Sequence, residues 1–196
     1  MVITRDMGSS PITTANTRVC NSSGRALSLK QVHGISTIPA PTNMKIISGA
    51  QTGADQAGLD VAHFLCMPTG GYITKGGRTS NGPLSKDYIA KMSLVELSSA
   101  SYQVRTWKNV EESDGTIRLA INFNSLGEKC TMNAIRNFHK PHLDVDLLDP
   151  LDIRVVRAWL MHLNIQVLNV AGNTQWTGKM DIYKLAYQYL LDVFNS

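Results

Sequence analysis

The chain has 196 residues, of which 43% are hydrophobic and 17% charged, and this balance excludes a disordered or collagen-like protein. No run approaches the roughly 20 apolar residues of a membrane-spanning helix. Most of the net charge of +4 falls within residues 1–43, so residues 44–196 offer no basic face for nucleic acid. Three scattered cysteines favour a reducing compartment. We therefore expect a cytoplasmic protein that binds neither nucleic acid nor a membrane.

Residues 1–43 are rich in Ser, Thr, Pro and Asn and show neither helical nor strand periodicity. The segment from Gly8 to Thr14 back-translates to GGT TCG AGT CCC ATC ACC ACC, which has the form of the T-arm and 3′ end of a transfer-RNA gene. One hypothesis is therefore that translation begins near Met44. The alternatives are an organelle-targeting peptide and a flexible extension. We treat residues 1–43 as a disordered or non-native extension and residues 44–196 as one domain.

From Lys45 onward, short apolar runs alternate with segments that carry an apolar stripe at helical spacing. The expected elements, in chain order, are strand 45–48, helix 54–64, strand 68–73, a long loop rich in Gly, Ser and Lys, helix 104–112, strand 116–122, helix 130–138, strand 143–147, helix 153–163, strand 166–170 and helix 182–193. Apolar strands that alternate with helices are typical of a parallel sheet covered on both faces. The sequence thus predicts a single doubly wound α/β domain with a mostly parallel, Rossmann-like sheet.

In such a sheet, ligands bind beyond the carboxyl ends of the strands, where the following helices begin. Glycine-rich and polar segments follow three of the expected strands at this edge. The ligand-binding residues that we predict there are Gly49, Gln51, Thr52, Gly53, Ala54, Asp55, Gly70, Gly71, Lys75, Gly76, Arg78, Gly172 and Asn173.

The loop after the first strand has the chemistry of an anion-binding site. Gly49 and Gly53 permit close backbone approach, and the free amides of the next helix carry partial positive charge. A tight turn capped by Thr52 is the structural alternative. Asp55 would compete with a bound anion, and it could instead accept hydrogen bonds from ribose or pterin donors.

The loop after the second strand places Lys75 and Arg78 among glycines. Arginine binds phosphate bidentately and lysine binds it as a point charge. A solvated surface loop is the alternative, but the length of this loop and its place at the ligand edge favour function.

The remaining polar residues predict structural roles. We expect a solvated face on helix 104–112, and a buried, inert thiol at Cys130. The solvated face is expected to include most of Arg105, Lys108, Asn109, Glu111, Glu112 and Asp114, of which Asp114, before Gly115, also suits a turn. The sequence holds no Ser-His-Asp, HExxH or paired-carboxylate signature, and His139 and His142 lack partners at metal-ligand spacing.

Four motifs occur in a fixed order along the chain. They are Ser48-Gly49-Ala50-Gln51-Thr52-Gly53-Ala54-Asp55, Pro68-Thr69-Gly70-Gly71-Tyr72 with Lys75-Gly76-Gly77-Arg78, the segment from Asn109 through Gly115-Thr116, and Leu168-Asn169-Val170-Ala171-Gly172-Asn173. Together they resemble the molybdenum cofactor carrier family, from about Lys45 to Phe194. The resemblance implies a Rossmann-like relative of the cytokinin-activating phosphoribohydrolases that binds the pterin-based molybdenum cofactor (molybdopterin) and forms homo-oligomers.

Two positions depart from the pattern of that family. Ala50 stands where family members commonly carry a second glycine, and Gly127-Glu128 stands where a Gly-Thr pair is usual at the start of the central helix. A carboxylate at a helix start repels an anion that lies across it. The glycine-rich stretch on which the hydrolase relatives depend is also missing, which argues against their activity.

The leading hypothesis is a non-catalytic carrier that stores or hands over molybdenum cofactor, or otherwise a nucleotide-like phosphate ligand, with molybdoenzymes as recipients. A second hypothesis is a hydrolase of nucleotides or phosphoribosyl compounds, with Glu111, Glu112 or Glu128 as acid or base. A third is a nucleotide-sensing module of the same fold.

Overall fold

The computed structural model describes residues 43–177 and 179–195. The expected N-terminal extension lies outside these residues, apart from Asn43. Within them, no helix is both long enough and apolar enough to cross a membrane.

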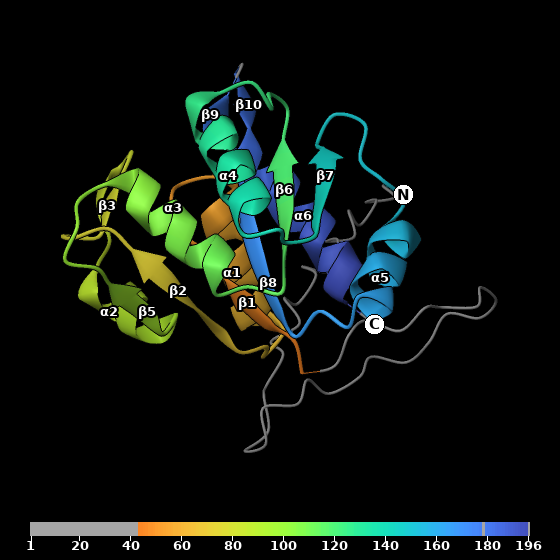
Figure 1. Ribbon diagram of the computed structural model, residues 1–196, viewed down its shortest axis with the longest axis horizontal. Helices are drawn as coiled ribbons and strands as arrows, with labels where there is room; N and C mark the ends of the chain where they lie inside the picture. The colour runs from red at the N-terminus through yellow and green to blue at the C-terminus, as the bar shows by residue number, and fades with distance from the viewer. Residues whose placement is uncertain (1–42, 178, 196) are drawn as a thin grey trace, which may run out of the picture.

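A parallel sheet of six strands forms the centre of the described domain (Figure 1). The strands are β1 (Lys45–Ile47), β2 (Thr69–Ile73), β5 (Leu94–Glu96), β6 (Gly115–Ala120), β7 (His142–Asp146) and β8 (Val167–Gly172). Their order across the sheet is β5-β2-β1-β8-β6-β7, and every neighbouring pair is parallel. In the register of the central strands, Ile46 lies opposite Thr69 on one side and Leu168 on the other.

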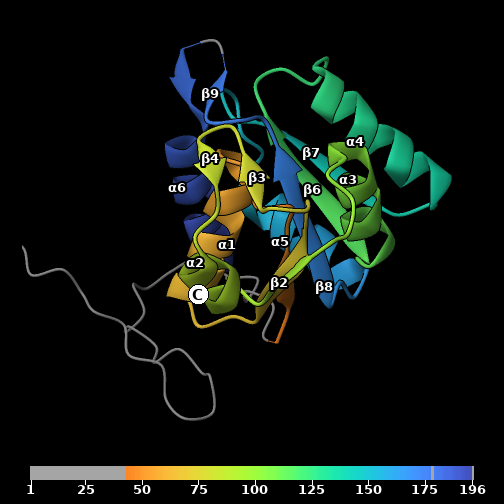
Figure 2. The same cartoon turned by 90° about the vertical axis from the view of Figure 1, so that its left-hand side faces the viewer.

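Helices cover both faces of the sheet, as Figure 2 shows. One face carries α1 (Ala54–Phe64), α5 (Ile153–His162) and α6 (Ile182–Phe194), and the other carries α3 (Tyr102–Glu111) and α4 (Leu126–Asn137). A short helix, α2 (Lys86–Lys91), packs beside β5. This arrangement confirms the predicted doubly wound, Rossmann-like fold.

The main core lies between the sheet and the helices α1, α5 and α6. Small residues let α1 approach the sheet closely: a Cβ atom on Gly58 would lie 2.7 Å from Cγ1 of Val170. Fully buried side chains such as Ile117, Leu160 and Leu190 fill the rest of this layer. Burial of this apolar surface is the main stabilising contribution, at about 25 cal/mol per Å².

The segment predicted as one long loop contains four short elements. They are β3 (Arg78–Thr79), β4 (Gly82–Pro83), α2 and β5. Strands β3 and β4 form a hairpin, as do β9 (Trp176–Thr177) and β10 (Met180–Asp181). Strands of two or three residues and a helix of six are too short to leave a clear periodic apolar pattern, so the sequence did not reveal them.

The helix predicted at 130–138 begins earlier, at Leu126. Ser125 caps it, because the Ser125 hydroxyl accepts a hydrogen bond from the Glu128 backbone N–H at 3.2 Å. This extra turn brings the N-terminus of α4 to the carboxyl edge of the sheet.

The direction of winding reverses between β1 and β8. After β1 the chain builds β2 and β5 on one side, and β6 and β7 then lie beyond β8 on the other. A reversal of this kind leaves a crevice beyond the carboxyl ends of the two central strands.

Candidate functional site

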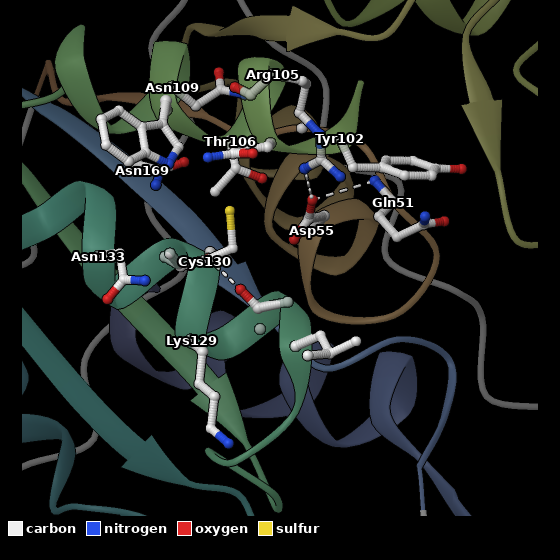
Figure 3. A pocket seen from close by; sticks show the side chains of 18 of the residues that line it. Gln51, Asp55, Tyr102, Arg105, Thr106, Asn109, Lys129, Cys130, Asn133 and Asn169 are labelled. Carbon is white, nitrogen blue, oxygen red and sulfur yellow. Dashed lines mark hydrogen bonds and ion pairs between the residues drawn. The ribbon is translucent and has the colours of Figure 1, made fainter. Parts of the chain in front are cut away.

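A cavity of about 600 Å³ lies beside this reversal, between α3 and α4 (Figure 3). Residues 169–172 of β8 form part of its lining, and Gly49 and Gln51 contribute from the loop after β1. The cavity therefore draws on segments that are more than 100 residues apart in the sequence.

Arg105 of α3 is the buried cation of this cavity, with 9% of the residue exposed. Its guanidinium lies directly against Gly49: a Cβ atom at that position would lie 1.5 Å from Nη1 of Arg105. No other residue type leaves room for Arg105 in its present position, so Gly49 is required by this contact.

Asp55, in the first turn of α1, holds the guanidinium in place. Nη1 of Arg105 donates to Oδ2 of Asp55 at 2.9 Å, and the Gln51 backbone N–H donates to the same oxygen at 3.2 Å. Burial raises the pKa of the Asp55 carboxyl, against the lowering effect of Arg105. Within the described residues, Nε of Arg105 has no hydrogen-bond partner. The cavity therefore contains a buried guanidinium with an unused donor.

Asn109, one turn after Arg105, fixes α3 to the sheet. Its Oδ1 accepts from the Tyr72 backbone N–H and its Nδ2 donates to the Tyr72 carbonyl, both at 2.9 Å. Nδ2 also donates to the Arg105 carbonyl at 3.2 Å. The expectation that Arg105 and Asn109 belong to a solvated helix face is wrong, because both are buried.

The N-terminus of α4 forms part of the facing wall, with Gly127, Lys129 and Cys130. Glu128 lies between them but does not line the cavity. Its carboxylate is buried, where Oε2 accepts from Nη1 of Arg118 at 3.4 Å. The expected repulsion between the Glu128 carboxylate and an anion at this helix start is thus reduced by its inward orientation.

Burial raises the pKa of the Glu128 carboxyl to about 7, against the opposing charge of Arg118. The negative charges of Asp55 and Asp144 add to this increase. A carboxyl group that titrates near neutral pH therefore lies just behind the cavity wall.

Asn173 ties the end of β8 to the loop after β6. Its Oδ1 accepts from the backbone N–H groups of Ile121 and Asn122, each at 3.0 Å. Its Nδ2 donates to the Asn122 carbonyl at 3.0 Å and to Oε1 of Glu128 at 3.3 Å. The side chain of Asn173 thus has four partners and stabilises the edge on which the cavity is built.

The structure brings some of the predicted binding residues to the cavity and places the others around it. Those that line it are Gly49, Gln51, Asp55 and Gly172. Those in the turn behind it, all buried, are Thr52, Gly53 and Ala54. Gly70 and Gly71 lie within β2, where a Cβ atom on Gly71 would lie 2.1 Å from the Ser48 carbonyl oxygen.

Lys75, Gly76 and Arg78 lie at the end of β2 and the start of β3, outside the cavity lining. Two contacts connect their loop to the cavity. Oε1 of Gln51 accepts from the Ser80 backbone N–H at 2.8 Å, and the Tyr102 hydroxyl lies 3.5 Å from the Arg78 carbonyl.

Cys130 is half-buried and lines the cavity. The prediction of a fully buried thiol is therefore wrong. Burial raises the pKa of the Cys130 thiol, while the Trp107 indole and the Arg105 guanidinium oppose this effect. Among the described residues, no three His, Cys, Asp or Glu side chains are grouped so that they could hold a metal ion.

The chain thus has a Rossmann-like fold with a cavity beside the point where the winding reverses, which is where ligands bind in sheets of this kind. The chain belongs to the circularly permutated YpsA SLOG family, whose model matches residues 46–194. Ala50, in the loop after β1, has a φ of 54°, a conformation that glycine adopts more readily than alanine.

A protein of known crystal structure from Syntrophus aciditrophicus SB, named "Putative molybdenum carrier protein", is similar to this chain. The two are 34% identical, with a TM-score of 0.71, over 80% of this chain and 98% of that one. No curated protein matches the chain significantly.

Proposed function

We propose that this chain is a non-catalytic carrier that holds a phosphorylated pterin-type ligand, molybdenum cofactor or a close relative of it, between α3 and α4. The similarity to a protein named as a molybdenum carrier, at 34% identity, supports this class of ligand. The cavity of about 600 Å³ falls within the usual size of small-molecule sites.

The observation that carries the proposal is the buried guanidinium of Arg105 in the cavity lining, which among the described residues is paired with one carboxylate, that of Asp55. Buried polar groups are costly without partners, so a guanidinium that lines a cavity favours a ligand with oxygen acceptors for its remaining N–H groups. Phosphate oxygens are suited to a guanidinium. The first amides of α4 add partial positive charge to the same cavity, and Lys129 adds a full one.

The positions of the three glutamates considered as acid or base favour a carrier over a hydrolase, and the one carboxylate that the described residues place in the cavity lining, that of Asp55, is bonded to Arg105 and to the Gln51 backbone N–H. Glu111 and Glu112 accept from Nζ of Lys108 and lie outside the cavity lining, and Glu128 points away from it. A general acid or base must reach the proton that it transfers. We therefore propose binding and shielding of the ligand, with the charges of Lys75 and Arg78 adding weak attraction near the opening.

The test is analysis of what the protein retains. Gentle purification of the wild type, followed by mass spectrometry and metal analysis of released small molecules, is expected to yield a phosphorylated pterin. Arg105→Leu should retain at least about tenfold less, because it loses a charge-assisted interaction of roughly 1.5–3 kcal/mol. Arg154→Leu is the matched control, since Arg154 pairs with Asp152 on the exposed surface.

The affinity for 6-hydroxymethylpterin diphosphate, measured by titration, should be similar in the wild type and Arg154→Leu and lower in Arg105→Leu. The proposal is wrong if the wild type neither yields a phosphorylated compound nor binds this one. It is also wrong if Arg105→Leu retains as much ligand as Arg154→Leu.

A further inference from the structure

Among the described residues of the cavity, Asn169 is a buried polar residue that forms no hydrogen bond with the Arg105–Asp55 pair. Asn169 lies in the middle of β8, between Leu168 and Val170, and only 3% of the residue is exposed. Its Nδ2 donates to Oγ1 of Thr116 at 3.2 Å. No donor among the described residues is bonded to its carbonyl oxygen, although the side chain lines the cavity.

A buried asparagine in an otherwise apolar central strand costs stability unless its hydrogen bonds are made. Among the described residues, the amide of Asn169 uses only its Nδ2 donor, in the hydrogen bond to its cross-strand neighbour Thr116. The unused acceptor of Asn169 therefore indicates that a ligand in the cavity places an N–H or O–H donor opposite it.

The Asp55–Arg105 ion pair and the amide of Asn169 lie at different sides of the cavity, and Lys129 lies on the α4 wall apart from both. Figure 3 shows Asn169 and Asn109 at one side, with Arg105 and Asp55 gathered at the other. Trp107 also lines the cavity and supplies an aromatic surface. The anionic part of a ligand is suited to the side of Arg105, which leaves the side of Asn169 for its neutral part.

We infer that Asn169 is a specificity-determining residue that recognises the ring of the ligand, by accepting a hydrogen bond from a ring N–H or amino group of a planar heterocycle. This inference rests on the proposed function and adds the orientation of the ligand to it. A pterin presents an amino group and a ring N–H along one edge, so its ring meets this requirement. The phosphoryl group then lies toward Arg105.

The experiment compares two probes that share one anionic group. They are 6-hydroxymethylpterin diphosphate, which has the ring, and inorganic pyrophosphate, which lacks it. Recognition of the ring is measured by the dissociation constant for pyrophosphate divided by the dissociation constant for the pterin diphosphate. In Asn169→Leu, which keeps the volume and removes the acceptor, this ratio should fall about tenfold, the effect of one lost hydrogen bond to a ligand donor.

Thr116→Val is the matched control, because it removes the partner of Asn169 without altering a residue of the cavity lining. It should keep the ratio within about twofold. Asn169→Ser, a smaller change, provides the same test if the leucine variant does not fold.

The outcomes separate this inference from the proposed function. If the wild type binds the pterin diphosphate and the ratio is unchanged in both Asn169 variants, the inference is wrong and the carrier proposal stands. The inference is equally wrong if Thr116→Val lowers the ratio as much as Asn169→Leu, or if the wild type binds pyrophosphate as tightly as the pterin. If the wild type binds neither probe, both proposals fail.

Discussion

Two buried arginines at the same edge of the sheet differ in how completely they are bonded. Arg118 of β6 donates to Asp144 through Nε at 2.8 Å and through Nη2, and to Glu128 through Nη1. It also lies 5.1 Å above the centre of the Phe123 ring. Arg105 lies 5.7 Å from the centre of the Tyr102 ring, but among the described residues it bonds only one carboxylate, that of Asp55, and it lines the cavity.

The difference separates a structural cation from one that is available to a ligand. The interactions of Arg118 are complete in the folded chain, so we expect it to contribute to stability. Arg105 lines a cavity and is paired with a single carboxylate among the described residues, so we expect it to contribute to binding. The predictions below test this division, starting with the largest effect.

Replacing Arg118 should cause the largest loss of stability. Arg118→Met leaves the buried Glu128 and the half-exposed Asp144 without their cation, and loss of one partner of a buried pair costs about 3 kcal/mol or more. Urea denaturation measures the change in the free energy of unfolding. Arg154→Met, at an exposed pair, should change it by less than about 0.5 kcal/mol. A loss below about 1 kcal/mol in Arg118→Met would contradict the structural role.

The pH dependence of stability should contain a contribution from Glu128. The pKa of its carboxyl is about 7 in the folded protein and 4.5 ordinarily, so the folded state binds the proton more tightly. The stabilisation is therefore complete below pH 4.5 and is lost as the pH rises through 7. Between pH 5 and 7 this group should lower the free energy of unfolding by about 2 kcal/mol.

Denaturation of Glu128→Gln at pH 5, 6 and 7 measures this contribution, since the variant should lose less stability than the wild type over the range. The contribution of Asp55 to stability also falls as the pH rises, because burial raises the pKa of its carboxyl too. The quantity to compare is therefore the difference in the free energy of unfolding between variant and wild type at each pH. Glu111→Gln, at an exposed position, should follow the wild type. Parallel curves for Glu128→Gln and the wild type would show that the Glu128 carboxyl is ionised throughout.

Two glycines of the cavity lining provide a matched pair. A Cβ atom on Gly49 would overlap Arg105, whereas a Cβ atom on Gly127 would meet nothing within 4 Å. Gly49→Ala should therefore displace the guanidinium and weaken binding of 6-hydroxymethylpterin diphosphate about tenfold, roughly 1.4 kcal/mol. Gly127→Ala should change it less than about twofold. Equal affinities in the two variants would contradict the role of Arg105 in ligand binding.

The smallest effect is expected from the loop outside the cavity. The double variant Lys75→Ala with Arg78→Ala removes two charges near the opening, and exposed charges at such distances are screened by salt. Affinity for the pterin diphosphate should fall by less than about threefold at 0.15 M salt. A loss of tenfold or more would mean that these side chains contact the ligand directly.

Much of the fold could be predicted from the sequence because its long elements carry clear periodic patterns. The apolar run at the start of β1 and the stripe of α6 are examples, and both lie where they were expected. The pattern was too short to reveal β5, a strand of three residues with only Leu94 buried. The start of α4 was missed because its first turn carries no inward apolar stripe: Leu126 is exposed, and the next three residues are Gly127, Glu128 and Lys129.

The site was harder to predict because its main residue resembles a solvated one. Arg105 lies among charged residues of α3, and only the packing of that helix against β2 buries it. One signal was available: Arg105 and Asn109 are four residues apart and so lie on one face of α3, away from the exposed Lys108 and Glu111. Asn169 carried a second signal, as an amide within an apolar strand.

Protection of Cys130 is the most direct test of whether the cavity is the binding site. Cys130 is a free thiol in the cavity lining, and peptide mass spectrometry can follow its alkylation separately from other cysteines. At pH 8.5, 6-hydroxymethylpterin diphosphate at a concentration that just saturates the wild type should slow alkylation of Cys130 at least about fivefold in the wild type and clearly less in Arg105→Leu, whose affinity is lower. Alkylation at the same rate with and without bound ligand in the wild type would place the ligand elsewhere and contradict the account.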